Sequence, residues 1–137
     1  MTEQLSPLAL QALAVVEESG AIINANHAHP HTIRHKGRID LVTETDIAVE
    51  AFLKERLASL APQAGFLAEE SAEDLSLPDT CWIIDPVDGT TNFAHGLPLT
   101  VTSVAYRLNG EIVLGIVNAP LLRECFIAEK GKGAWRN

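Results

Sequence analysis

The stretch 82–93 constrains the fold of this chain more than any other part of its sequence. Its apolar beginning, residues 82–84, is rich in β-branched and aromatic side chains, which predicts the end of a buried strand. Pro86 cannot continue a hydrogen-bonded ladder, and Asp88-Gly89 is typical of a turn. The chain is therefore expected to leave the sheet at the proline and to turn there.

The same stretch predicts a short helix with an anion site at its start. Thr90 is a good N-cap for a helix through Phe93, which would leave the amides of Gly89 and Thr90 pointing outward. Asp85 and Asp88 place two carboxylates for hard cations beside these donors. This pairing indicates metal-assisted phosphate chemistry. The alternative is an ordinary strand-to-loop turn, because such a string by itself also occurs in turns.

A second group of carboxylates stands upstream. Residues 65–71 predict a strand whose end carries Glu69 and Glu70. If this end lies beside Asp85 in a sheet, the acids converge, and two bare carboxylates ~4 Å apart repel by roughly 4 kcal/mol at an effective dielectric constant of about 20. A fold tolerates such a pair by protonating one acid or by binding cations. All-oxygen ligands beside a phosphate pocket favour magnesium.

The overall charge limits which partners the chain can bind. It has 137 residues, 47% of them hydrophobic, and a net charge of −8, which predicts one globular domain without nucleic acid or anionic membrane as a partner. Binding a phosphate would then require metal cations. Cys81 and Cys125 are expected as free core thiols. The start has no signal-peptide pattern, and no apolar run is long enough to span a bilayer, so the cytoplasm is the expected location.

Two helices are predicted ahead of the strands. Ser6-Pro7 is an N-cap followed by a first-turn proline, and the first helix is expected to reach about Asn26. The second is expected to begin within 40–46 and to end near Leu60. Apolar positions at helical spacing predict the buried faces: Leu10, Leu13, Val16, Gly20 and Ile23 in the first helix, and Ile47, Val49, Phe52, Leu53, Leu57 and Leu60 in the second.

Two features between these helices allow more than one interpretation. Asp46 is expected in the first turn of the second helix, where the helix dipole would stabilise its carboxylate without any catalytic role. Four of the five histidines lie within 27–35, where they could form a zinc or nickel site or bind such metals only adventitiously. Lys36 follows in a predicted loop, where a solvated lysine is the ordinary case.

The second half of the chain predicts strands in antiparallel order. Residues 99–108 and 111–117 flank Asn109-Gly110, the strongest short signal for a hairpin. A third strand is expected over 124–130, followed by a glycine turn at 131–133. Helices followed by strands predict an α+β fold, in which two helices pack on a mainly antiparallel sheet.

Three motifs together resemble the inositol monophosphatase family. They are residues 41–46 (Leu-Val-Thr-Glu-Thr-Asp), residues 68–71 (Ala-Glu-Glu-Ser) and residues 85–93 (Asp-Pro-Val-Asp-Gly-Thr-Thr-Asn-Phe), in the family's order and at its approximate spacing. The turn 131–134 (Gly-Lys-Gly-Ala) fits as well. The resemblance covers essentially the whole chain but only about the front half of a family member.

The resemblance implies Mg²⁺-dependent hydrolysis of a phosphate monoester, with a small phosphorylated polyol or sugar as the substrate, inositol monophosphate first among them. It also implies inhibition by lithium and a homodimer. Glu69 would bind metal, and Asp85 would bridge two metals. The carbonyl of Val87 and the carboxylate of Asp88 would complete the metal ligands.

The resemblance also assigns the remaining site residues. Gly89 and Thr90 would hold the phosphate, and Asp46 with Thr90 would orient or deprotonate the attacking water. Lys36 would line a loop near a third metal. These roles raise Asp46 from a helix-cap carboxylate to a catalytic residue.

Two departures from the family pattern bear on activity. Ala68 replaces the family's common glycine, a change expected to be harmless. The family's last metal carboxylate belongs to a Trp-Asp motif in its second domain, which residues 1–137 do not contain. We therefore expect an N-terminal metal- and phosphate-binding domain that alone has an incomplete second metal site. There are two alternatives. One is fructose-1,6-bisphosphatase activity, and the other is a non-catalytic interaction protein that keeps only this scaffold.

Overall fold

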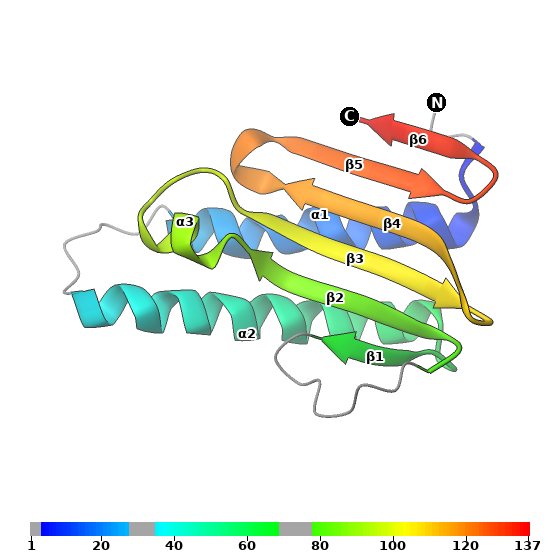
Figure 1. The fold of residues 1–137 in the computed structure, drawn as a ribbon, viewed down its shortest axis with the longest axis horizontal. Coiled ribbons are helices and arrows are strands. Elements are labelled where there is room, and N and C mark those ends of the chain that lie inside the picture. The colour runs from blue at the N-terminus through cyan, green and yellow to red at the C-terminus, as the bar shows by residue number, and fades with distance from the viewer. Residues whose placement is uncertain (1–3, 28–34, 69–77) are drawn as a thin grey trace.

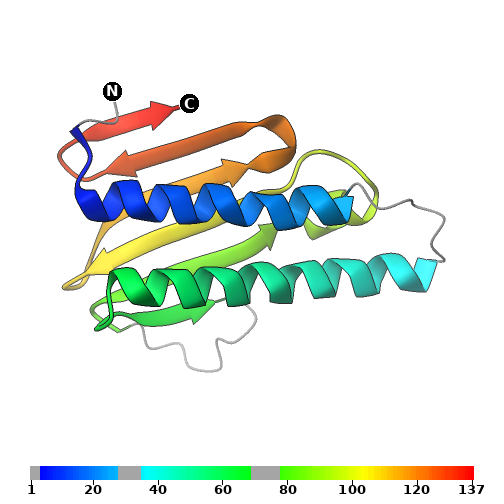
Figure 2. The ribbon, with the colours of Figure 1, turned by 180° about the vertical axis from the view of Figure 1, so that it is seen from behind.

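Two long helices cover one face of a six-stranded sheet in the computed structural model, which describes residues 4–27, 35–68 and 78–137 (Figure 1). Seen from behind, both long helices lie over the strands (Figure 2), and neither covers the opposite face of the sheet, which faces the viewer in Figure 1. The elements are α1 Pro7–His27, α2 His35–Leu60, β1 Gly65–Ala68, β2 Cys81–Asp88, α3 Thr90–Ala94, β3 Val101–Leu108, β4 Glu111–Ala119, η3 Pro120–Leu122, β5 Glu124–Glu129 and β6 Gly133–Arg136.

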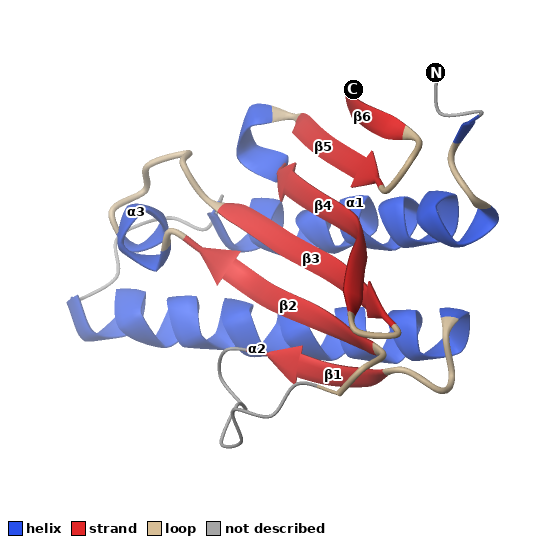
Figure 3. Cartoon of the chain, turned by 45° about the vertical axis from the view of Figure 1, so that its right-hand side comes forward, coloured by secondary structure: helices blue, strands red, loops and turns tan. Residues whose placement is uncertain are grey.

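The strands lie in the sheet in the order in which they follow along the chain, from β1 to β6. β1 and β2 are parallel, and every later neighbouring pair is antiparallel. Figure 3 shows the strands as one layer with the two long helices on a single side. The predicted α+β fold, two helices on a mainly antiparallel sheet, is confirmed.

The buried face of α1 differs in part from the predicted one. Val16, Gly20 and Ile23 are buried as expected, but Leu10 is 39% exposed. Ala9 and Ala12 are fully buried instead. Small side chains let the helix axis approach the sheet closely, so the face that packs is the one with the alanines and not the one with the larger leucine. In α2, Ile47 is exposed in the same way, whereas Val49, Leu53 and Leu57 are buried as predicted.

The second helix begins earlier than predicted, at His35, so Lys36 lies in its first turn and not in a loop. Asp46 is consequently a residue of the helix interior. The prediction that it lies in the first turn, where the helix dipole would stabilise its carboxylate, is wrong. Thr45, beside it, is fully buried, and its Oγ1 accepts a hydrogen bond of 2.6 Å from Asn26 Nδ2 of α1. This contact packs the expected helix start, now a helix interior, against α1.

The strand β2 continues through Pro86, where the sequence predicted that it would end. Its pairing with β3 shifts register between Asp85 and Asp88, and a bulge of this kind is one of the few places in a sheet that accept proline. Both carboxylates therefore belong to the strand and not to a loop after it.

The predicted hairpin at Asn109-Gly110 is confirmed. Both residues have positive φ, 51° and 84°, as a type I′ turn requires, and Leu108 pairs with Glu111 across it. Cys81 and Cys125 are buried free thiols, as expected. Contrary to expectation, α1 is long and apolar enough for a membrane span by length and composition. Because its buried residues pack in the core against the sheet, we interpret α1 as a core helix.

Candidate functional site

The short helix α3 starts from a glycine and not from the threonine that the sequence favoured as its cap. Gly89 is the N-cap residue, in the left-handed region with φ 90° and ψ 39°, and no side chain caps the helix. A Cβ at this position would lie 2.6 Å from the carbonyl oxygen of Leu99. Gly89 therefore meets two demands at once, a positive φ and a close approach of backbone, and Thr90 becomes the first helical residue.

Three contacts, one from the loop to β3 and two from α1, hold α3 and the loop after it in place. Asn92 Nδ2 donates to Leu99 O at 2.9 Å, inside the loop that leads to β3. His27, the last residue of α1, donates from Nε2 to Gly96 O at 3.1 Å. Its ring also lies 6.1 Å from the ring of the buried Phe93. The end of α1 thus anchors the segment that carries Gly89 and Thr90.

A pocket of about 400 Å³ brings two of the predicted motifs together. Val42, Thr43, Asp46 and Ile47 line it from α2, and Thr90 lines it from α3. Asp46 is buried, with 8% of its surface exposed, whereas Thr90 is exposed. Asp46 and Thr90 lie 44 positions apart in the chain and share one cavity through the fold. They are the two residues predicted to act together on a water molecule.

The predicted metal ligands lie on the bulged end of β2. Asp85 is half-buried and pairs with Ser103, and Asp88 is exposed and pairs with Val101. The side chain of Val87, between them, is buried. Two carboxylates and a backbone carbonyl within four consecutive residues form an all-oxygen donor set, the chemistry that magnesium prefers.

Some predicted residues cannot be placed in this site. Glu69, Glu70 and most of the histidine-rich segment lie outside the described residues, and so does the side chain of Lys36. Within 4–27, 35–68 and 78–137, no group of three or more His, Cys, Asp or Glu side chains comes together as a metal site. The donor types fit magnesium, while the full set of ligands stays a prediction.

Sequence reasoning missed two residues that support the site. Thr102 of β3 donates from Oγ1 to Pro86 O at 2.8 Å, and His27 holds the loop after α3. A signal for Thr102 exists in the sequence, because it occupies a core-facing position of a strand whose next core-facing residues are Val104 and Tyr106. No signal pointed to His27, since the pattern of neighbouring histidines suggested metal binding.

Comparison with known proteins gives one consistent result. The model of the inositol monophosphatase family matches residues 4–137. The chain is 44% identical over 130 residues to an inositol monophosphatase of Dictyostelium discoideum, covering 92% of this chain and 48% of that protein. It is 44% identical over 98 residues to a fructose-1,6-bisphosphatase/inositol-1-monophosphatase of Thermotoga maritima, covering 72% of this chain and 38% of the relative.

The fold agrees with the sequence match. The crystal structure of the extragenic suppressor protein suhB of Bartonella henselae superposes with a TM-score of 0.80 at 33% identity, over 96% of this chain and 52% of that one. The chain thus spans about half the length of the relatives it matches.

Proposed function

Because this chain belongs to the inositol monophosphatase family, we propose that it serves the magnesium-dependent hydrolysis of small phosphate monoesters, with inositol monophosphate as the first substrate to test. The observation that carries the proposal is the pocket shared by Asp46 and Thr90. It joins a buried carboxylate of α2 to the first residue of α3. Water attack on phosphorus requires a group that positions the water and accepts its proton close to the phosphate.

Each residue has a role in this proposal. Glu69, Asp85, the carbonyl of Val87 and Asp88 would together hold two metal ions, with Asp85 shared between them. Bound magnesium would supply the positive charge that a chain of net charge −8 lacks and that a phosphate ester requires.

The remaining roles fall to α2 and α3. The amides at the start of α3, those of Gly89 and Thr90, would bind phosphate oxygens. Asp46 and the Thr90 hydroxyl would orient the attacking water, and Asp46 would accept its proton.

Metal binding is the first experiment, because it tests the chain 1–137 itself. We expect excess Mg²⁺ to raise the melting temperature, since a ligand present at 100 times its Kd stabilises by about 2.7 kcal/mol. Asp85→Asn should abolish this shift. Asp79→Asn is the matched control, because Asp79 is exposed at the other end of β2 and its loss changes the charge equally. A shift that survives Asp85→Asn would remove Asp85 from the metal site.

Activity is the second experiment. Phosphate release from inositol monophosphate should require Mg²⁺ and decrease with lithium. Since the chain spans about half of its relatives, we expect its turnover to be far below that of a family member of full length. Thr90→Ala should lower turnover with less loss of Mg²⁺ affinity than Asp85→Asn causes. Equal losses of affinity in the two variants would contradict the roles given to them.

One relative supports a second substrate. The Thermotoga maritima protein, whose name joins fructose-1,6-bisphosphatase to inositol-1-monophosphatase, is 44% identical to this chain. Fructose 1,6-bisphosphate therefore belongs beside inositol monophosphate in the same assay. A folded protein that binds Mg²⁺ and releases phosphate from neither ester would favour the non-catalytic alternative. The homodimer implied by the resemblance and the cytoplasmic location expected from the sequence stay predictions.

A further inference from the structure

Two threonines on the same side of β3 differ in one respect. Thr100, just before the strand, and Thr102, within it, are both buried, with 1% and 0% of their surface exposed. The hydroxyl of Thr102 donates to Pro86 O at 2.8 Å. The hydroxyl of Thr100, among the described residues, has no hydrogen-bond partner.

The carbonyl that Thr102 binds lies inside the bulge of β2. From the pair Asp85–Ser103 to the pair Asp88–Val101, β2 advances three residues while β3 advances two. The extra residue interrupts the regular ladder and leaves backbone groups of β2 without the partner that a ladder supplies. Thr102, the residue between Ser103 and Val101, gives the Pro86 carbonyl a side-chain donor in place of a backbone amide.

This hydrogen bond fixes the peptide between Pro86 and Val87. The carboxylate of Asp85 precedes that peptide and the carbonyl of Val87 and carboxylate of Asp88 follow it. Rotation of the peptide would alter the direction of the Val87 carbonyl relative to both carboxylates. Since Thr102 is fully buried, water has no access to replace the hydroxyl.

We propose that Thr102 is a positioning residue for the metal site. Its hydroxyl sets the backbone of the bulge so that Asp85, the Val87 carbonyl and Asp88 are directed to serve as metal ligands. The inference rests on the proposed magnesium-dependent function and adds to it a residue that contacts neither metal nor substrate. This role also explains the bulge. In a regular strand Asp85 and Asp88, three positions apart, would point to opposite faces of the sheet.

The test compares two substitutions of nearly equal shape. Thr102→Val and Thr100→Val each replace a buried hydroxyl with a methyl group, but only the first removes a hydrogen bond. Mg²⁺ affinity is measured by calorimetric titration of the folded 1–137 chain. We expect Thr102→Val to weaken Mg²⁺ binding by about tenfold or more, as loss of a partner behind the direct ligands usually does. Thr100→Val should leave the affinity unchanged.

Two further measurements separate positioning from mere stability. Thr102→Ser keeps the hydroxyl and should retain most of the affinity, whereas Thr102→Ala should lose it, so the pair isolates the hydroxyl even if the valine variant does not fold. In metal-free protein, the amide NMR shifts of Val87 and Asp88 should change in Thr102→Val and not in Thr100→Val.

The outcomes distinguish this inference from the proposed function. Wild-type chain that binds no Mg²⁺ would overturn the metal site and the positioning role together. Tight binding in the wild type that is equally tight in folded Thr102→Val and Thr102→Ala would overturn only the positioning role.

Discussion

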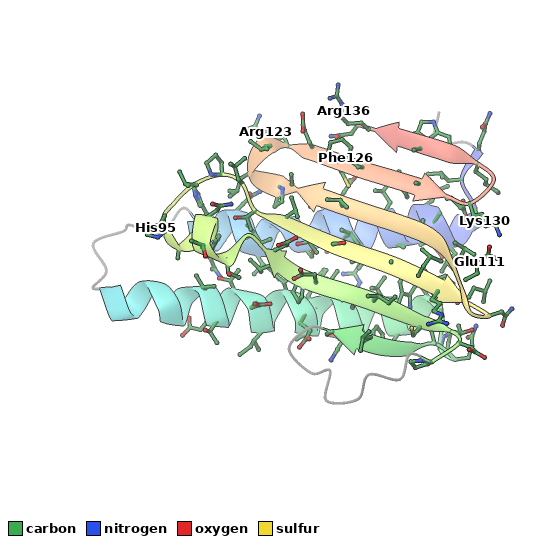
Figure 4. The ribbon with its side chains drawn as sticks, in the orientation of Figure 1. His95, Glu111, Arg123, Phe126, Lys130 and Arg136 are labelled. Atoms are coloured by element: carbon green, nitrogen blue, oxygen red, sulfur yellow. The ribbon has the colours of Figure 1, made fainter. Side chains whose placement is uncertain are left out.

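The two ends of the sheet are built in different ways. Figure 4 shows Glu111 and Lys130 together at one end, where they form an exposed ion pair, and His95 at the other. We call the first the hairpin end; it contains the turn after β3, the turn after β5 and the start of α1. We call the second the site end; it contains the bulge of β2, α3 and the junction of β4 with η3.

Turns whose backbone conformation suits their own residues form the hairpin end. Asn109 and Gly110 make the turn between β3 and β4, and Gly131, with φ 76°, makes the next one. A Cβ on Gly131 would meet no atom within 4 Å, so only the sign of φ requires glycine there. Long-range hydrogen bonds also reach this end, because the Gly110 amide donates to Asp79 O at 2.8 Å and the Asn109 amide donates to Thr80 Oγ1 at 3.2 Å. Ser6, just before α1, binds the carboxylate of Glu129 at the end of β5.

Close approaches between distant segments dominate the site end. Gly20 of α1 touches Pro120 after β4, and Gly89 touches the backbone of Leu99. Thr102 binds Pro86. The turns of the hairpin end follow from the conformational preferences of their own residues, and their long-range hydrogen bonds add to that preference. The close approaches of the site end require several segments to be correctly placed at once. The geometry of the site end is therefore closely defined, and we expect substitutions there to destabilise the fold more than substitutions at the hairpin end.

Gly89→Ala should have the largest effect on stability. The alanine would keep a positive φ, which costs about 1–2 kcal/mol, and its Cβ would overlap Leu99 O at 2.6 Å. We expect a loss of about 3 kcal/mol in the free energy of unfolding, measured by urea denaturation. Gly131→Ala, at the hairpin end, is the control, with φ strain alone and a loss of about 1 kcal/mol. Equal losses of unfolding free energy in the two variants would contradict the proposed difference between the two ends of the sheet.

Gly20→Ala should follow. A Cβ on Gly20 would lie 2.9 Å from Pro120 Cβ and 2.9 Å from Asn118 Nδ2. Replacing a helix-interior glycine by alanine normally stabilises by about 1 kcal/mol, but overpacking costs about 1–3 kcal/mol or more. Because the proline ring is rigid, we expect a net loss of about 2 kcal/mol. Gly115→Ala in β4 is the control, since open space surrounds that position, and it should be neutral or stabilising. The melting temperatures of both variants test this prediction, and a Gly20→Ala variant as stable as Gly115→Ala would contradict it.

The contrast between the ends explains what the sequence could predict. The hairpin, the first helix with its Ser6-Pro7 start and the antiparallel order follow from residues close together in the chain. The start of α2 and the path of β2 through Pro86 do not, because both segments pack against others that are distant in the chain, with Asn26 bound to Thr45 and Thr102 bound to Pro86. The motifs identified the family, but their meeting in one pocket required the fold.

Ser6→Ala tests one long-range link of the hairpin end, the contact with Glu129. Ser6 Oγ accepts from the amide of Ala9 at 3.1 Å and donates to Glu129 Oε2 at 2.6 Å. Loss of an N-cap hydroxyl typically costs about 1 kcal/mol. We expect that decrease in urea denaturation, without any change in Mg²⁺ affinity, because the cap lies far from the site end. Ser59→Ala, an exposed helix position, should change stability by less than about 0.5 kcal/mol. Weaker Mg²⁺ binding in Ser6→Ala would show that the ends are coupled.

An effect on stability that is absent at neutral pH separates the two thiols. The pKa of Cys125 is raised to about 12, chiefly by burial and further by the Glu17 carboxylate of α1, while a hydrogen bond from the Phe126 amide acts in the opposite direction. Burial also raises the pKa of Cys81, at the hairpin end, but there the guanidinium of Arg107 acts in the opposite direction.

Above pH ~9 an unfolded thiol ionises while the folded Cys125 keeps its proton. The unfolded state then binds fewer protons than the folded state, so the free energy of unfolding decreases as the pH rises, by at most about 1.4 kcal/mol for each pH unit. Cys125→Ala removes this titration and should flatten the decrease between pH 8 and pH 10. Cys81→Ala should flatten it less, because Arg107 offsets part of the burial and no acid like Glu17 adds to it. Urea denaturation at pH 8, 9 and 10 under reducing conditions gives the slopes. A slope in Cys125→Ala equal to that of the wild type would show that the thiol beside Glu17 ionises as readily in the folded chain as in the unfolded one.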